Sequence, residues 1–171
     1  MTMETELIRA VIEDSSLSVD ESQETIREKI KIVVFSAGTS LYALPAADIQ
    51  EIMLDLQLHY LPFMPPFIRG LVNRLGEPLT VVDLVNLFSG GQLDGRAFMI
   101  LKPSISKMAI LIDSVKDILE ASLDELKPLP PTGNPVDLFV QSVMRKKTED
   151  VMILNLHEIL SAVRRGIHAV S

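Results

Sequence analysis

Histidines and aspartates are the side chains of this sequence that could do acid–base or metal chemistry. The three histidines, His59, His157 and His168, are scattered, and none stands at i, i+4 spacing from another histidine, as a helical metal site requires. Asp83 and Asp113 could in principle form an acid–base pair. Asp83, however, stands between an apolar run and a short helical pattern, which favours a helix cap. We therefore predict no catalytic residue and no metal site.

The glycine-rich and basic segments do not indicate a phosphate or nucleic-acid site. Gly90, Gly91 and Gly95 are not followed by the Lys-Ser/Thr of a phosphate-binding loop, so we interpret them as a flexible joint. The basic residues 145–147 are followed at once by Glu149 and Asp150, which indicates a charged turn. The sequence predicts no cofactor and no nucleic-acid partner.

The composition is that of one ordinary acidic domain. The chain has 171 residues, of which 16 are basic and 23 acidic, giving a net charge of −7, and it has no cysteine. The absence of cysteine excludes disulfides, thiol nucleophiles and Cys-ligated metals, and the acidity disfavours binding along a phosphate backbone. No apolar run approaches the roughly 18 residues of a membrane span. We expect a cytoplasmic protein without direct membrane insertion.

Most of the acidity lies in residues 1–29, which hold eight acidic and three basic residues and a net charge of −5. We interpret this range as an N-terminal extension. Its apolar residues at 7, 8, 11 and 12 could form one short amphipathic helix, but a flexible, solvating tail fits the composition better. The domain itself is expected at residues 30–165, followed by a tail at 166–171.

Short apolar runs bounded by turn residues predict a mainly β protein, either a barrel or a sandwich. Helices are expected to be short. One follows the Asp83 cap and ends at Gly90, and another ends at Gly166. The expected strands are 31–35, 41–44, 79–82, 98–101, 108–112 and 151–154, and the expected helical segments are 49–53, 84–89, 115–119 and 156–165.

The sequence repeats itself with offsets of 66, 68 and 72 residues along the chain. Ile49-Gln50-Glu51-Ile52 matches residues 115–118, Leu61-Pro62 matches Leu129-Pro130, and Val81-Val82-Asp83-Leu84 matches residues 153–156. The two Pro-x-x-Pro segments, 62–65 and 128–131, fall at nearly matching places, so rigid spacers fit them better than polyproline ligands. We predict two repeats, 30–96 and 97–165, that are too small to bury much surface alone and therefore share a core.

Several ordered motifs resemble the CheW family of chemotaxis coupling proteins, over residues 31–162. They are Phe35-x-x-Gly38-x-x-x-Tyr42-Ala43-Leu44-Pro45, Ile49-Gln50-Glu51-Ile52, Pro66-Phe67-Ile68-Arg69-Gly70-Leu71-Val72-Asn73 and Val81-Val82-Asp83-Leu84. The resemblance implies two tandem SH3-like five-stranded β-barrel subdomains on a shared apolar core, with short helices including one near the C-terminus.

The resemblance also implies a non-enzymatic scaffold in chemotaxis signal transduction. Such a protein links the cytoplasmic tip of a methyl-accepting chemoreceptor to the regulatory domain of a CheA-type histidine kinase, which is itself built like CheW. One barrel end meets the kinase, and the cleft between the barrels takes the receptor's hairpin tip. The protein is then cytoplasmic and is recruited to membrane receptor arrays.

Matching to the family motifs gives candidate contact residues for kinase or receptor. Ile49, Gln50 and Glu51 match a segment of the family's binding surface, although Ile49 could equally be core. Gly70 matches a glycine near the contacts, although a conformational need for glycine explains it as well. Arg69 and Asn73 flank it as expected rim or turn residues.

One motif departs from the family pattern. The family reads Asn-Leu-Arg-Gly, whereas this chain reads Asn73-Arg74-Leu75-Gly76. In a strand, exchanging neighbours would move the arginine to the opposite face and place Leu75 at the interface. Arg74 and Leu75 are therefore candidate specificity residues. An adaptor of another chemosensory system, such as type IV pilus motility, stays a second hypothesis, and a small β-barrel ligand-binding protein or hydrolase a remote third.

Overall fold

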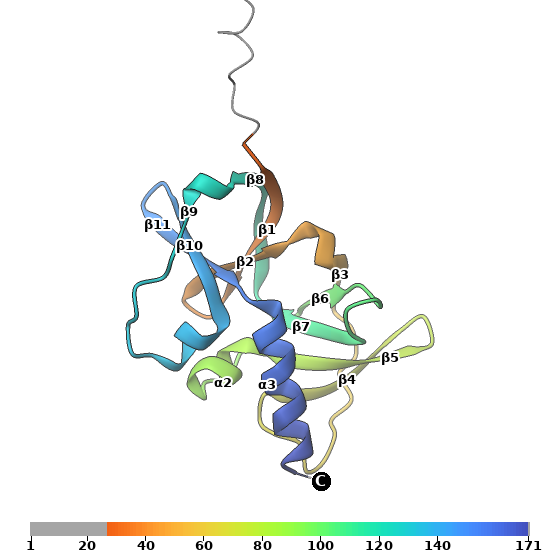
Figure 1. Ribbon diagram of the computed structural model, residues 1–171. Coiled ribbons are helices and arrows are strands. Elements are labelled where there is room, and N and C mark those ends of the chain that lie inside the picture. Colours follow the sequence, from red (N-terminus) through yellow and green to blue (C-terminus); the bar gives the residue numbers. More distant parts are fainter. Residues whose placement is uncertain (1–26, 171) are drawn as a thin grey trace, which may run out of the picture.

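The computed structural model describes residues 27–170, and Figure 1 shows their course. The helix considered at residues 7–12, and most of the predicted acidic extension, lie outside the described residues. The strands are β1 (Lys29–Ala37), β2 (Ser40–Pro45), β3 (Ile49–Leu54), β4 (Ile68–Arg74), β5 (Glu77–Asp83), β6 (Ala97–Leu101), β7 (Met108–Ile112), β8 (Ser114–Ser122), β9 (Leu126–Lys127), β10 (Val140–Lys146) and β11 (Glu149–Leu154). The helices are η1 (Ala46–Asp48), α2 (Leu84–Ser89), η2 (Leu123–Glu125), η3 (Pro135–Phe139) and α3 (Leu156–His168).

The strands form two sheets, which we call the first and the second barrel. The first barrel has five strands in the order β3-β6-β7-β5-β4, and the second has six in the order β8-β1-β2-β11-β10-β9. Most neighbours are antiparallel, but β5 pairs with β7, and β11 with β2, in parallel. The predicted mainly β fold with two small barrels is confirmed, with the two-residue strand β9 adding a sixth strand to the second barrel.

The two sequence repeats exchange strands between the barrels. The hairpin β1–β2 from the first repeat belongs to the second barrel, and the hairpin β6–β7 from the second repeat belongs to the first. Neither repeat can therefore complete a barrel alone, and the barrels are held together by chain connectivity as well as by packing.

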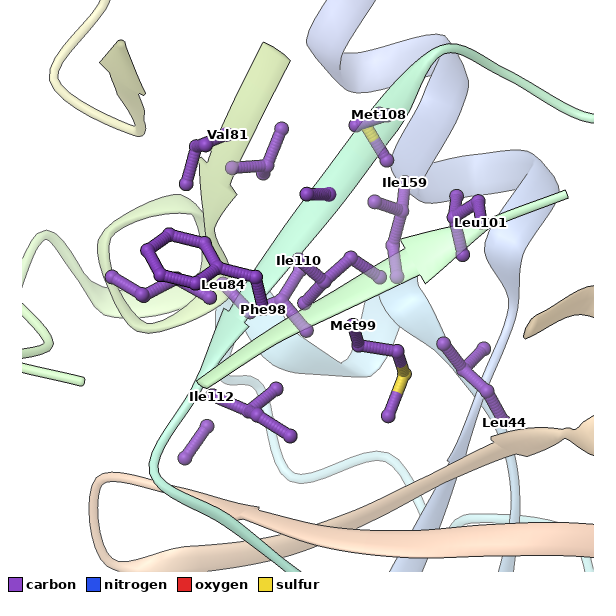
Figure 2. Packing of buried hydrophobic residues seen from close by; sticks show 14 of the residues in the cluster. Leu44, Val81, Leu84, Phe98, Met99, Leu101, Met108, Ile110, Ile112 and Ile159 are labelled. Atoms are coloured by element: carbon purple, nitrogen blue, oxygen red, sulfur yellow. The ribbon is translucent and has the colours of Figure 1, made fainter. Parts of the chain in front are cut away.

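The main apolar core joins both barrels and α3. Val33 and Phe35 of β1 face this core, whereas Ile32 and Val34 face a smaller cluster inside the second barrel. A strand buried on both faces reads as a continuous apolar run, which explains why residues 31–35 lack alternation. Figure 2 shows how Ile159 of α3 packs beside Met108 and Leu101 of the first barrel.

Capping residues place the two helices as expected, with one correction. The side chain of Asp83 accepts a hydrogen bond from the Asn86 backbone at the start of α2, and Gly90 ends that helix with φ of 74°. Asn155 caps α3 in the same way. The predicted stop at Gly166 is wrong, because α3 continues to His168. Gly166 is needed there because a Cβ would overlap the ring of Phe67.

The predicted helical turns around residues 49–53 and 115–119 are also wrong. Both segments are strands, β3 and β8, at the edges of their barrels. The apolar spacing suggested a helix, but both strands carry irregular register or half-buried side chains on both faces, which removes the alternation that marks a strand.

Candidate functional site

An ion pair stands at corresponding positions in the two barrels, between the edge strands β3 and β4 of the first and between the edge strand β8 and the next-to-last strand β10 of the second. In the first barrel Arg74 of β4 donates to Glu51 of β3, and in the second barrel Lys146 of β10 donates to Asp117 of β8. The hydrogen bond from Lys146 lowers the pKa of Asp117 below its usual value. The two predicted site residues Glu51 and Arg74 are thus brought together, and their side chains help to close the first barrel.

The hairpin between β4 and β5 presents an apolar residue beside this ion pair. Leu75 and Gly76 form its two-residue turn with φ of 50° and 88°, and the Asn73 side chain accepts a hydrogen bond from the Gly76 backbone at 2.7 Å. Leu75 is 90% exposed. A leucine at positive φ costs about 1 kcal/mol relative to a right-handed conformation, and exposure recovers none of it. The fold itself therefore gives no reason for leucine here.

Polar groups surround this tip. Gln50 is exposed and shares a shallow depression with Arg74, Glu77 and Lys107, of which the last two form an ion pair at 3.2 Å. Ile49 is half-buried and packs against the core. We name Gln50, Glu51, Asn73, Arg74 and Leu75 the first-barrel tip. An apolar anchor within a polar rim is the usual anatomy of a protein–protein contact.

The structure corrects the expectation that Arg69 is a rim residue. Its guanidinium donates to the buried carboxylate of Asp83 at 2.9 Å and to the carbonyl of Leu93 at 2.7 Å. Asp83 also accepts from the Leu93 backbone at 2.9 Å. Arg69 therefore anchors the connection that follows α2 to the first barrel and does not belong to the first-barrel tip.

Gly70 has a conformational role. Its φ is 136°, and a Cβ would overlap the carbonyl oxygen of His59. His59 and Leu71 exchange two backbone hydrogen bonds of 2.7 and 2.8 Å beside it. Of the two explanations considered from the sequence, the need for glycine is the one that the geometry supports, so a substitution at Gly70 would disturb the fold before it reported on any contact.

The strand argument for the exchanged Arg74 and Leu75 is wrong for Leu75. Arg74 is the last residue of β4, but Leu75 lies in the turn, where strand alternation does not apply. Arg74 points back to Glu51 while Leu75 extends away from the barrel. With this departure from the family pattern, Arg74 forms an ion pair with Glu51 at the end of β4, and Leu75 is exposed in the turn that follows.

Sequence reasoning missed a second exposed apolar segment, in the loop between β3 and β4. Phe63 is 87% exposed with φ of 60°, Tyr60 is also exposed, and so is Leu54 at the end of β3, just before the loop. A phenylalanine at positive φ in water is unfavourable both for the backbone and for the side chain. The signal was present in the sequence as an aromatic residue between Pro62 and Pro65, but the prolines were interpreted only as spacers.

A groove with both polar and apolar lining runs beside α2 and the segment that follows β9. It consists of two adjoining cavities of about 440 and 750 Å³ that share Thr39, Ser40 and Met152. We name it the α2 groove. Burial raises the pKa of Tyr42 in its floor. Its other lining residues include Val85, Phe88, Ser89, Pro135 and Val136 at one end and Lys127, Pro128, Leu129, Pro130, Val143 and Arg145 at the other.

Within residues 27–170, no three histidine, aspartate or glutamate side chains lie close enough together to hold a metal ion. No helix in the same range is long and apolar enough to cross a membrane. The predicted absence of a metal or cofactor stays a prediction.

Residues 31–164 match the family model of the CheW-like domain. The chain belongs to the CheW-like family. It is 25% identical over 145 residues to the chemotaxis protein CheW of Treponema pallidum (strain Nichols), covering 79% of this chain and 84% of that protein. It is 24% identical over 144 residues to the protein FrzA of Myxococcus xanthus, covering 81% and 90%.

The fold agrees with a solved CheW-like structure. The scaffolding protein TtCheW from Thermoanaerobacter tengcongensis superimposes with a TM-score of 0.67 at 25% identity, covering 78% of this chain and 89% of that chain. The resemblance predicted from the motifs is thus confirmed, and with it the SH3-like fold and the general role of a chemotaxis coupling scaffold.

Proposed function

We propose that this CheW-like protein links the cytoplasmic tip of a methyl-accepting chemoreceptor to the regulatory domain of a CheA-type histidine kinase, and that it has no catalytic activity of its own. The observation that carries the proposal is the first-barrel tip, where an exposed leucine at positive φ stands within a polar rim. Strained, exposed residues persist when function requires them.

The first-barrel tip is the surface we assign to the kinase. Its rim charges are already paired within the chain, as in Arg74–Glu51 and Lys107–Glu77, so a partner does not have to neutralise them. Burying Leu75 would contribute about 1.5–3 kcal/mol. A micromolar affinity corresponds to about 8 kcal/mol, so the rest would come from the contacts around this anchor.

The α2 groove is the surface we assign to the receptor. It offers apolar side chains such as Leu129, Val143 and Met152, and its two cavities of about 440 and 750 Å³ would accept part of a helical hairpin. Its residues come from the second barrel and from α2, which follows β5 of the first barrel, so an occupant would contact both halves of the molecule.

Calorimetry of the full chain against the regulatory domain of a CheA-type kinase from the same genome tests the kinase half. We expect a one-to-one complex with Kd of about 1 μM. Replacing Leu75 by Asn, which tolerates positive φ, should weaken it about tenfold. Exposed Leu54, replaced by Asn, is the matched control and should leave the affinity unchanged. A folded chain that binds no such kinase domain would contradict the proposal.

A second candidate function has support from one relative. The Myxococcus protein FrzA covers as large a share of this chain as the Treponema CheW does. An adaptor of another chemosensory system, such as type IV pilus motility, would use the same surfaces with a different kinase and receptor. Binding to the kinase of one system, and not to that of the other, separates the two candidates.

The remaining expectations belong to this proposal. The protein would act in the cytoplasm and be recruited to receptor arrays through its partners. Residues 30–165 would form the coupling domain, with repeats 30–96 and 97–165, flanked by the extension 1–29 and the tail 166–171.

A further inference from the structure

The two main helices occupy corresponding places in the repeats but differ in length. α2 follows the Asp83 cap and α3 follows the Asn155 cap, 72 positions later. α3 has 13 residues, packs Ile159 and Val163 into the core and reaches Phe67 with Gly166. α2 has 6 residues and ends at Gly90. The surface beside α2 is therefore left open, and it forms the end of the α2 groove that Val85 and Phe88 line.

The described chain begins beside η2. The carbonyl oxygen of Glu28 accepts a hydrogen bond from the Leu123 backbone at 3.2 Å, and Arg27 lies 3.9 Å from Asp124. Both partners belong to η2, which leads directly into β9 and then into residues 127–130, one wall of the groove. Residues 1–26 thus join the described chain beside the element that precedes this wall.

The sequence of this tethered segment suits the groove. Leu7, Ile8, Val11 and Ile12 would share one face of a helix, and acidic residues stand on both sides of them at 4, 6, 13 and 14. The floor of the groove offers Leu129, Val143 and Met152 as apolar partners.

The charged residues that line the groove are balanced, with Lys127 and Arg145 against Glu149 and Asp150. Arg145 is paired with Asp150 at 2.9 Å, and Glu149 is exposed there. Lys127 takes part in none of the ion pairs found among residues 27–170. Lys127 is therefore the cation that can pair with an acidic residue of the segment.

The tether is long enough for docking within one chain. Residues 15–26 would span up to about 40 Å when extended, which is comparable with the diameter of a globular domain of this size. A tethered ligand of this kind has an effective concentration in the millimolar range, so even weak contacts fill the site much of the time.

We propose that residues 4–14 dock as a short amphipathic helix in the α2 groove of the same chain, between Leu129 and Met152. The docked segment would cover the end of the groove that residues 127–130 line. Because we assign the same groove to the receptor, the segment would also compete with the receptor; this consequence rests on the proposed function, whereas the docking does not.

Paramagnetic broadening in the full chain tests the docking. The chain has no cysteine, so Ser15→Cys gives a single site for a nitroxide label. We expect the amide signals of Val143 and Met152 to lose about twofold more intensity than that of Gly76 at the first-barrel tip. Ile8→Asp with Ile12→Asp should abolish the difference. Thr2→Asp with Ser18→Asp adds the same charge outside the apolar pattern and should preserve it.

Equal broadening at both places would overturn the proposal, and so would a difference that survives the double aspartate change at 8 and 12. A mixture of labelled chain with unlabelled, isotope-enriched chain must show no selective broadening, since such an effect would mean docking between chains. Binding of a receptor hairpin peptide is measured separately. We expect the Ile8→Asp, Ile12→Asp chain to bind the receptor peptide about threefold more tightly than the original chain does. If neither chain binds the peptide, the result counts against the proposed function and not against the docking.

Discussion

At the hairpin tip of the first barrel stands Leu75, and 72 positions later, at the tip of the second, stands Lys147. Both residues adopt nearly the same backbone conformation, with φ of 50° and 55°. Beside each tip an ion pair links the strand that leads to the tip with the edge strand opposite, Arg74 of β4 with Glu51 of β3 and Lys146 of β10 with Asp117 of β8. A strained turn and a closing ion pair therefore belong to the shared fold, whereas the exposed leucine belongs to the first barrel alone.

A second comparison concerns the bulge in the strand that leads to each tip. Both β4 and β10 shift register at the same place, between Ile68 and Gly70 and between Val140 and Ser142. In the first barrel the bulge carries Arg69, which holds the buried Asp83, whereas the corresponding Gln141 is exposed. Features that the two barrels share, such as the bulge, therefore belong to the common fold. Features that differ, such as the Arg69–Asp83 ion pair, are specific to one barrel.

The largest expected effect comes from breaking the buried ion pair of the first barrel. Arg69→Met would leave the buried Asp83 carboxylate without its cation and should lower the free energy of unfolding by about 3–5 kcal/mol. Gln141→Met at the corresponding place should change it by less than about 0.5 kcal/mol. Urea unfolding followed by circular dichroism measures both, and equal losses would show that the barrels do not differ in this way.

The bulge glycine should give the next largest difference. Gly70→Ala should destabilise by about 2–3 kcal/mol, because the Cβ meets the His59 carbonyl and φ is 136°. Ser142→Ala removes a buried hydroxyl that has no hydrogen-bond partner within residues 27–170, and should be neutral within about 0.5 kcal/mol. Urea unfolding measures both changes. If Gly70→Ala has no effect on stability, Gly70 becomes a candidate contact residue for a partner again.

The two tips should separate stability from binding. Leu75→Asn and Lys147→Asn each relieve a residue at positive φ and should each raise the unfolding free energy by up to about 1 kcal/mol. Only Leu75→Asn should weaken the kinase complex. If Lys147→Asn weakens it equally in calorimetry, the leucine is not what distinguishes the first barrel.

The smallest effect concerns the closing ion pair of the second barrel. Lys146→Met removes the hydrogen bond that lowers the pKa of Asp117, so this pKa should rise toward its usual value. A lowered folded-state pKa contributes stability above the unfolded pKa, and that contribution is lost as pH falls through the folded value. In the variant, this contribution should become smaller above the unfolded pKa, because the difference between the folded and unfolded pKa of Asp117 shrinks. An NMR titration of the Asp117 carboxyl carbon checks the direction.

The sequence predicted the fold where local chemistry is decisive. Asp83 and Gly90 bound a helix because capping and positive φ need those residue types. The same reasoning failed at Gly166, whose small size serves contact with Phe67 rather than helix termination. It also failed at 49–53, since an irregular edge strand in a closed barrel loses its alternation.

The candidate site was predicted only in part, for a related reason. Spacing and family motifs led to Glu51, Arg74 and Leu75, which the structure gathers at one end of the first barrel. Spacing and motifs could not show that Arg69 and Gly70 have structural roles. Arg69 pairs with the buried Asp83, and Gly70 lies against the His59 carbonyl, and both contacts depend on the tertiary fold. Spacing and motifs also could not reveal Phe63, whose significance lies in an exposure that no local pattern fixes.

Reconstitution of receptor, kinase and this chain tests the coupling role most directly. Sedimentation of receptor-bearing membranes measures how much CheA-type kinase they carry. We predict that the kinase sediments with the receptor in proportion to the added chain, up to one chain per kinase regulatory domain, and that Leu75→Asn reduces this recruitment while Lys147→Asn does not. Recruitment of the kinase to the same extent without the chain, or with the Leu75→Asn variant, would contradict the account.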